Sequence, residues 1–291
     1  MNTAMQLPLI DQLRIALASR WRAFGDPWHL RMRAAARFGE TDMRRDPAEQ
    51  LYAALYLDRI TQVLPAASGL RILDAGCQAG RLAIPLARAG HHVTGLDISA
   101  DWLSRCRRNC DEADVQIELV QAGLDQVADH FKAASFDVVL CAEVLYALRE
   151  PASALRSLAS VLRPTGTLIT SHRTRHYMLT TLARHHLLDD MATVATASEG
   201  EILGGQYYNW FDLPELRVLY AEAGLRVLTS EGIGTLSGVG VDGMAAVLDP
   251  ADLDDVGRAK LLAVERACSE RFPDAARYRL IVAAPDPRPT P

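Results

Sequence analysis

The sequence has few lysines, few aromatic residues and no long apolar run. Lys132 and Lys260 are the only lysines among 31 basic residues, and 36 acidic residues leave a net charge of −5. A net negative chain does not favour binding to a phosphate backbone, so we expect no nucleic-acid partner. No stretch reaches the roughly 18 to 20 apolar residues of a membrane span. The N-terminus also lacks a basic leader before an apolar block, so we expect a cytoplasmic protein without a membrane partner.

The five cysteines are odd in number and form no C-x-x-C pair. This usage is typical of a reducing cytosol rather than of a disulfide framework. Cys106 and Cys110 lie one helical turn apart, but no histidine or carboxylate set completes a metal site beside them. We therefore expect partly buried thiols and no bound metal.

Periodicity divides the chain into a helical beginning and a core of alternating strands and helices. Residues 9–65 alternate apolar and charged positions at helical spacing, which predicts an N-terminal helical cap over residues 1–66. Short apolar or β-branched runs begin near residues 70, 92, 115, 136 and 166, and helical patterns such as 99–112 and 151–162 separate most of them. This alternation predicts an α/β fold, doubly wound around a parallel sheet.

Four further elements are predicted beyond this core. Residues 174–190 have a helical pattern, and residues 192–211, which include Gly204 and Gly205, have an irregular one. The segment 213–224 predicts a helix that ends at Gly224. The runs LRVLTSEGI (225–233) and ARYRLIVAA (276–284) predict the last strands, separated by a polar loop and helix over 238–275.

A glycine-rich turn follows the first predicted strand, in the run LDAGCQAG (73–80). Gly76 lets the chain bend sharply so that backbone N–H groups can approach a ligand, and Gly80 opens a helix whose N-terminus favours anionic groups. The spacing differs from the G-x-G-x-x-G of dinucleotide sites, which disfavours NAD or FAD. Asp74, at the end of the strand, could instead accept a hydrogen bond from an ammonium group.

Asp97 ends the second run of the core, 17 residues after Gly80. A carboxylate there can accept hydrogen bonds from both hydroxyls of a ribose. The alternative is a helix cap, but Ser99 is better placed for that role before the helix that follows.

These segments together resemble the class I S-adenosylmethionine (SAM)-dependent methyltransferases, especially the small-molecule branch with the ubiquinone-biosynthesis O-methyltransferases. The resemblance covers residues 70–172 and lies in the runs LRILDAGCQAGRLAIPLARAGHHVTGLDIS, FDVVLCAEVLYALREP and LASVLRPTGTLITS. It implies a seven-stranded Rossmann-like sheet whose last strand, ARYRLIVAA, is antiparallel. It also implies a SAM-binding domain over residues 67–291, with insertions that cover the substrate near 174–211 and 238–275.

The resemblance implies SAM as the cofactor. Asp74, Gly76 and Gly80 would surround its methionine end, Asp97 would hold the ribose and Ile98 would lie against the adenine. Glu143 and Val144 would sit beside the reacting methyl group. The full set of expected cofactor contacts is Asp74, Gly76, Cys77, Gln78, Gly80, Asp97, Ile98, Gly123, Leu124, Glu143 and Val144.

Three positions depart from the family pattern. Gln78 replaces the usual middle glycine of the turn, and Ala147 stands where relatives often have histidine. Relatives often place an acidic residue near the adenine amino group, and here Asp125 could serve only if the loop shifts by two residues. These departures leave open an alternative function, a non-catalytic SAM-binding or scaffold protein of the same fold.

The candidate catalytic residues follow the fifth strand, because ligands bind at the carboxyl ends of strands in open α/β sheets. His172 and His176 could act as a base near neutral pH, or could be structural. The segment QYYNWF (206–211) could wall an aromatic substrate, with a hydrogen bond from Tyr208 or Asn209, or could pack before a helix capped by Asp212.

We expect methyl transfer to a small-molecule acceptor, with oxygen favoured over nitrogen or carbon. The sequence does not indicate the oligomeric state.

Overall fold

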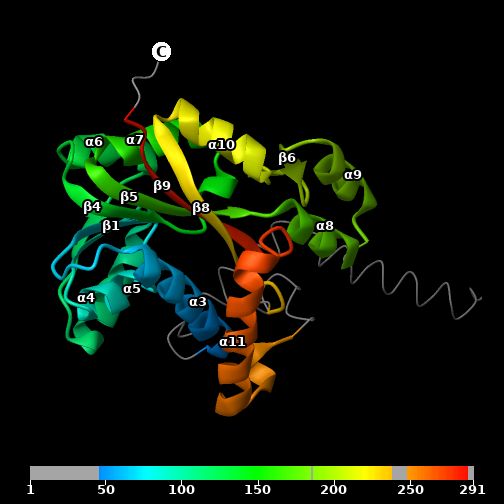
Figure 1. Cartoon of the computed structure of the whole chain (residues 1–291), viewed down its shortest axis with the longest axis horizontal. Helices are drawn as coiled ribbons and strands as arrows, with labels where there is room; N and C mark the ends of the chain where they lie inside the picture. Colours follow the sequence, from blue (N-terminus) through cyan, green and yellow to red (C-terminus); the bar gives the residue numbers. More distant parts are fainter. Residues whose placement is uncertain (1–45, 185, 238–247, 288–291) are drawn as a thin grey trace, which may run out of the picture.

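A mixed seven-stranded sheet forms the centre of the molecule, in the order β3-β2-β1-β4-β5-β9-β8 (Figure 1). The computed structural model describes residues 46–184, 186–237 and 248–287. The parallel strands are β1 (Arg71–Ala75), β2 (His92–Asp97), β3 (Glu118–Gln121), β4 (Phe136–Cys141) and β5 (Leu162–Arg173). Strand β9 (Tyr278–Pro285) runs antiparallel between β5 and β8 (Leu225–Ile233). The predicted α/β fold with an antiparallel last strand is confirmed.

Helices cover both faces of this sheet (Figure 1). The strand residues Leu73, Val139 and Leu168 share one core with α7 and α10, whereas Ile72, Val138 and Leu140 share another with α3 and α4. Because both faces are covered, the central strands β1 and β4 are buried along most of their length, whereas the edge strands β3 and β8 have exposed positions. The helices are α4 (Ala83–Arg88), α5 (Ala100–Ala113), α6 (Val127–His130), α7 (Pro151–Ser160), α10 (Leu213–Glu222) and α11 (Asp255–Arg271).

Helix α3 (Pro47–Val63) is the described part of the predicted N-terminal cap. The Asp46 carboxylate accepts hydrogen bonds from two backbone N–H groups of the first turn, which is a typical N-cap. The buried residues Tyr56 and Ile60 of α3 belong to the same core as Ile72 and Leu140 of the sheet. The remainder of the cap lies outside the described residues, and the domain boundary at residue 66 stays a prediction.

The segment between β5 and α10 is an insertion with its own small core. The predicted helix over 174–190 is in fact two helices, α8 (Arg175–Arg184) and α9 (Leu188–Thr196). The irregular stretch expected over 192–211 is wrong, because an antiparallel hairpin of β6 (Glu199–Ile202) and β7 (Gln206–Asn209) follows α9. Leu203, Gly204 and Gly205 all have positive φ angles, which close its turn. Trp210, fully buried, packs with residues of α8 and α9.

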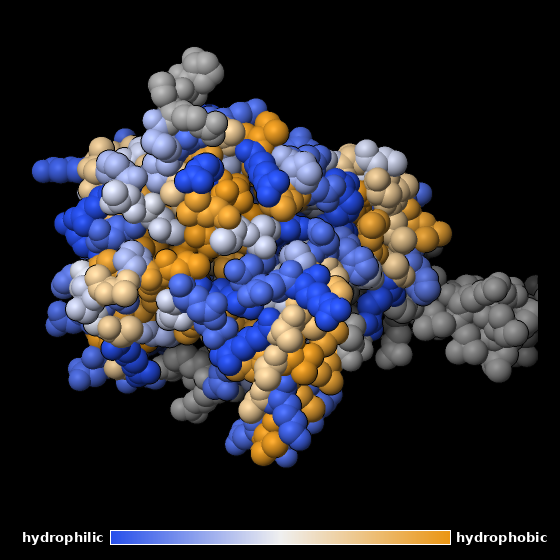
Figure 2. All heavy atoms as spheres, viewed as in Figure 1, coloured by the Kyte–Doolittle hydropathy of each residue, from blue (hydrophilic) through white to orange (hydrophobic). Residues whose placement is uncertain are grey.

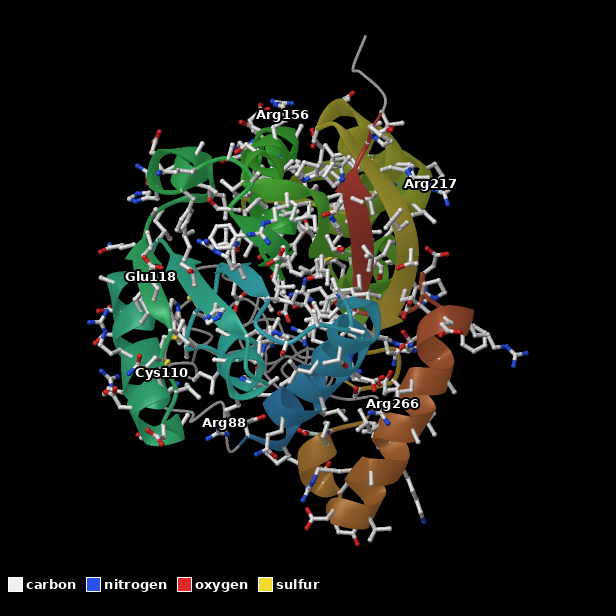
Figure 3. All side chains as sticks on the ribbon, turned by 60° about the vertical axis from the view of Figure 1, so that its left-hand side comes forward. Arg88, Cys110, Glu118, Arg156, Arg217 and Arg266 are labelled. Carbon is white, nitrogen blue, oxygen red and sulfur yellow. The ribbon has the colours of Figure 1, made fainter. Side chains whose placement is uncertain are left out.

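The outer surfaces of the helices are mostly polar. Arg156 and Arg217 project outward from α7 and α10 (Figure 3). Apolar side chains reach the surface along α11 (Figure 2), where Val256 and Val264 are exposed. Within the described part of the chain, no helix has the length and apolar character to cross a bilayer.

Candidate functional site

The turn after β1 is bent tightly against β2. The backbone N–H groups of Gly76 and Cys77 both donate to the Leu96 carbonyl, at 2.7 and 3.1 Å. Gly76 has a φ of +87°, and a Cβ at this position would lie 2.5 Å from Cγ2 of Val144, which follows β4. Both observations require glycine at position 76. The fold therefore brings the first and fourth parallel strands together at their carboxyl ends.

Asp97 holds the same turn from the end of β2. Its Oδ2 accepts the Gln78 N–H at 3.0 Å, and its Oδ1 accepts the Ser99 N–H at 2.9 Å. Gln78 has a φ of +46°, so a side chain occupies a left-handed conformation that glycine adopts more easily. The Ser99 hydroxyl caps α5, as the sequence predicted, by accepting the Trp102 N–H. Ser99, and not Asp97, is therefore the N-cap of α5, and Asp97 lines the cavity described next.

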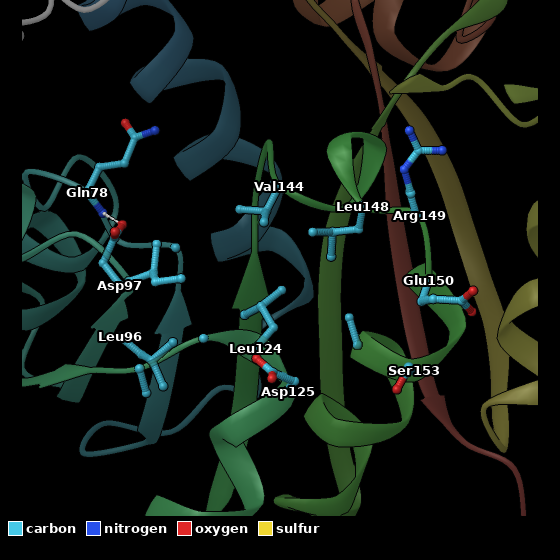
Figure 4. A pocket seen from close by; sticks show the side chains of 15 residues that line it. Gln78, Leu96, Asp97, Leu124, Asp125, Val144, Leu148, Arg149, Glu150 and Ser153 are labelled. Atoms are coloured by element: carbon cyan, nitrogen blue, oxygen red, sulfur yellow. Dashed lines mark hydrogen bonds between the residues drawn. The ribbon is translucent and has the colours of Figure 1, made fainter. Parts of the chain in front are cut away.

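A cavity of about 510 Å³ opens at the carboxyl ends of β1 to β4 (Figure 4). One side, here called the turn wall, comes from the ends of β1, β2 and β3. The other, the helix wall, comes from the segment after β4 and the first turn of α7. The turn wall consists of Gly76, Gln78, Leu96, Asp97, Ile98, Ala122, Gly123, Leu124 and Asp125; the helix wall consists of Val144, Leu148, Arg149, Glu150, Ser153 and Ala154.

Seven of the eleven predicted cofactor residues line this cavity: Gly76, Gln78, Asp97, Ile98, Gly123, Leu124 and Val144. The other four are not among the lining residues, although each lies within two positions of one in the chain: Asp74, Cys77, Gly80 and Glu143. The sequence interpretation missed the helix wall beyond Val144. The signal for it was available, because the first turn of a helix after a parallel strand lies at the same edge as the strand end.

Asp125 reaches into the space above Gly123. A carboxylate oxygen of Asp125 occupies the position that a Cβ on Gly123 would take, and both residues line the cavity. Asp125 therefore lines the cavity, and a contact of its carboxylate with the adenine stays a prediction. The absence of a side chain at position 123 makes room for the carboxylate.

Arg81 links the turn to two other elements. Its guanidinium pairs with Glu49 of α3 at 3.2 Å and with Glu143 after β4. Glu143 has a φ of +62°, its N–H donates to the Ser171 hydroxyl at 2.7 Å, and its carboxylate accepts from the Tyr278 hydroxyl at 2.6 Å. Burial alone would raise the pKa of Glu143, but the charge of Arg81 and further guanidinium groups lower that pKa to about 2. Glu143 is therefore an anion held in place, and a weak base.

Asp74 is buried behind the turn. Burial raises the pKa of its carboxyl to about 7, although the nearby Arg81 charge acts in the opposite direction. A cationic group bound next to it would favour the ionised form. Asp74 does not line the cavity, and the ammonium partner stays a prediction.

His172 lies in the interior, away from the residues that line the cavity. It is fully buried, its Nε2 is 2.9 Å from the Tyr220 hydroxyl of α10, and burial lowers its pKa to about 3. Because side chains alternate along a strand, the next residue, Arg173, lies on the opposite face. Its guanidinium is 4.8 Å from the ring centre of Tyr146 and 4.4 Å from that of Tyr278. His176 is exposed on the first turn of α8.

Tyr208 contacts the 3₁₀ turn Leu145–Ala147, which lies between two residues of the helix wall. Its ring stacks on Tyr146, with ring centres 6.1 Å apart, and Tyr146 follows Val144 by two residues. Asn209 does not offer its amide to a substrate, because that group donates to the carbonyls of Leu145 and Leu148. The packing alternative for the 206–211 segment is confirmed, because Trp210 packs inside the insertion and Asp212 caps α10. Tyr208 is half-buried, and its role in walling a substrate stays a prediction.

An open parallel sheet with a cavity at its strand ends, a glycine turn and a carboxylate after the second strand defines a nucleotide-binding Rossmann-like protein. The comparisons narrow this class. A family described as a methyltransferase domain matches residues 66–214, about half of the chain. The chain belongs to this family and is a SAM-dependent methyltransferase, with SAM as its cofactor.

Two curated relatives and one solved structure illustrate the similarity. The ubiquinone biosynthesis O-methyltransferase of Actinobacillus pleuropneumoniae serotype 5b is 33% identical over 171 residues, covering 56% of this chain and 72% of the relative. The enzyme of the same name from Pectobacterium atrosepticum is 29% identical over 224 residues, covering 75% and 85%. A SAM-dependent methyltransferase from Mesorhizobium loti superposes with a TM-score of 0.53 at 21% identity, covering 80% of this chain and 99% of that one, which supports the fold.

The residues of the cavity fit this cofactor. Ile98, Leu124 and Val144 offer apolar surfaces of the kind that an adenine ring packs against, and Asp97 offers a carboxylate to hydroxyl groups. Gly76 leaves a cradle that a Cβ would fill. The roles of the individual residues remain predictions.

Proposed function

We propose that the protein transfers the methyl group of SAM to an oxygen atom of a small aromatic acceptor. The similarity to enzymes named O-methyltransferases supports oxygen as the attacked atom. The observation that carries the acceptor side is an aromatic pair whose first member, Tyr146, stands in the chain shortly after Val144 of the helix wall. Val144 ends the cavity next to Gly76, and two residues later Tyr146 stacks on Tyr208 of the insertion.

Our proposal assigns the cofactor to the cavity in one orientation. Asp97 accepts hydrogen bonds from the ribose hydroxyls, and Asp125 accepts one from the adenine amino group. Asp74 and the Gly76 turn receive the methionine end. When bound, SAM supplies a methyl group on a positively charged sulfonium. The chain's own task is then to place the acceptor oxygen in line with it next to Val144.

Positioning is the main catalytic contribution in this proposal. Holding two reactants in line lowers a barrier by about 7 to 11 kcal/mol in favourable model systems, whereas a general base adds about 10² to 10⁴-fold. His172 does not serve as that base here, because its ring is buried against Tyr220. Tyr146 and Tyr208 offer flat apolar faces to an aromatic acceptor, and Arg173 lies against Tyr146. An acceptor with an acidic hydroxyl, such as a phenol or catechol, suits this arrangement.

The test is a release assay for S-adenosylhomocysteine (SAH) with a panel of phenols, catechols, aromatic amines and thiols, followed by mass spectrometry of the products. We expect turnover with phenols or catechols and a methyl ether as product. A product methylated on nitrogen would contradict the oxygen assignment. Turnover only with acceptors that have no ring would contradict the aromatic one.

A further inference from the structure

The helix wall of the cavity begins with a single short turn. Between β4 and α7, the Ala147 N–H donates to the Val144 carbonyl at 3.1 Å, and the Leu148 N–H donates to the Leu145 carbonyl at 3.2 Å. These bonds form the 3₁₀ turn Leu145–Ala147. Val144 and Leu148, on either side of it, both line the cavity. The shape of one cavity wall therefore depends on this turn.

One side chain from the insertion holds the turn. Asn209 ends β7, some 60 residues further along the chain, and is 1% exposed. Its Nδ2 donates to the Leu145 carbonyl at 3.0 Å and to the Leu148 carbonyl at 3.2 Å. A single amide thus satisfies carbonyls at both ends of the turn. Buried carbonyls that lose such donors carry an uncompensated desolvation cost.

The other contacts between the hairpin and this segment differ in strength. Arg149 pairs with Glu201 at 2.6 Å and lies 4.6 Å from the ring centre of Tyr207, but the side chains of Arg149 and Glu201 are 64% and 55% exposed. Exposed ion pairs stabilise little. The stack of Tyr146 on Tyr208 is a contact between rings and gives the carbonyls of the turn no hydrogen bond. Asn209 is thus a buried polar connection between the insertion and the turn in the cavity wall.

We propose that Asn209 is a positioning residue that holds the Leu145–Ala147 turn, and through Val144 and Leu148 sets the cavity for the cofactor. The insertion that carries Tyr208 is thereby coupled to cofactor binding. The proposal rests on the placement of the cofactor in this cavity. It does not depend on the identity of the acceptor.

The competing explanation is that Asn209 only stabilises the insertion. Trp210 provides a matched control, because it is the next residue, is fully buried, and donates its Nε1–H to the Ala197 carbonyl at 2.7 Å. That bond lies inside the insertion and does not touch the turn. Trp210→Phe therefore removes a buried hydrogen bond of the insertion without releasing a carbonyl of the cavity wall.

The experiment is calorimetric titration of SAH into the full chain and its variants. Asn209→Ala should raise the Kd for SAH about tenfold, and Asn209→Asp, which keeps the shape but loses both N–H donors, at least as much. Trp210→Phe should lower the melting temperature while its Kd stays within about twofold of the wild type. A wild-type Kd in Asn209→Ala, or an equal loss in Trp210→Phe, would overturn the proposal.

Hydrogen exchange gives a second readout on the wild-type protein, which holds even if the Asn209 variants do not fold. SAH should slow exchange at Ala147 and Leu148 and, together with them, in the hairpin over 199–209, because coupling acts in both directions. Protection of the turn without the hairpin would overturn the coupling. Asp97→Ala separates the two ideas: unchanged SAH affinity in that variant would refute the placement of the cofactor itself.

Discussion

The two walls of the cavity are built in different ways. The turn wall is held by its own neighbours: Gly76 binds the Leu96 carbonyl, Gln78 binds the Asp97 carboxylate, and the Ala122 N–H binds the Asp97 carbonyl. The helix wall receives its main buried polar contact from Asn209 of a distant hairpin. The turn wall is therefore a local product of three strand ends. The helix wall, in contrast, is hydrogen-bonded through Asn209 to the insertion.

The largest effect is expected where the walls touch. Gly76→Ala places a Cβ against Val144 and forces alanine to a positive φ, so SAH affinity should fall by about 100-fold or more. Val144→Ala in the same chain should restore part of this loss by removing Cγ2. Titration calorimetry measures both effects.

Gly90→Ala is the matched control for that variant. Gly90 has a φ of +88°, but a Cβ there meets nothing within 4 Å. The variant should lose some stability and keep its SAH affinity. Equal losses of affinity in the two variants would show that backbone strain, rather than contact between the walls, explains the effect.

The next effect is the pH dependence that Asp74, buried behind the turn, gives to stability. The pKa of Asp74 is raised to about 7 from an ordinary 3.8, so between these values the folded state holds a proton that the unfolded state has lost. Stability from this group is therefore fully present below about pH 4, falls as pH rises toward 7 and is level above it. Melting curves of the wild type should show this decline, and Asp74→Asn should lack it.

The same group should affect ligand binding in the opposite direction. An ammonium beside Asp74 favours its ionised form, so SAH affinity should fall by up to about tenfold from pH 7 to pH 6 in the wild type. Calorimetry in buffers of different ionisation enthalpy should detect proton release on binding near pH 7. A release of the same size from Asp74→Asn would assign the proton to another group.

A smaller effect is expected at Asp125. Replacing its carboxylate in Asp125→Asn should reduce the preference for SAH over its inosine analogue about fivefold, because the amide can also donate to a base carbonyl. Competition titrations measure this ratio. Asp129→Asn, an exposed neighbour on α6, should leave the ratio unchanged. An unchanged ratio in Asp125→Asn would mean that the carboxylate does not read the base.

The smallest predicted effect lies beyond the helix wall. Tyr208→Leu should raise the KM for an aromatic acceptor about threefold, because it removes one flat face of the Tyr146 pair. Tyr207→Leu is the control, since the Tyr207 hydroxyl points to Glu199 and its ring to Arg149. Steady-state kinetics at saturating SAM should distinguish the two variants. Equal KM values for the acceptor in both would show that Tyr208 does not contact the acceptor.

The turn wall could be predicted from the sequence because its signals are local. Gly76 and Asp97 each follow a strand directly, and their function needs only the rule that parallel strands end at one edge. The hairpin was also within reach, since short strand-like runs flank Gly204 and Gly205. His172 was not. Pairing of β5 with β9, more than 100 residues later, sets His172 opposite Arg279 and buries it, and no local pattern reports such a contact.

The ion pairs of Arg81 bear on whether the strands of the sheet could fold without helix α3. The residue after the glycine turn shares its charge between Glu49 of α3 and Glu143 after β4. A fragment that began at β1 would lose one of these carboxylates and would uncover the apolar side of Ile72 and Leu140. A fragment that keeps both carboxylates of Arg81 and the cover of this face must therefore include α3.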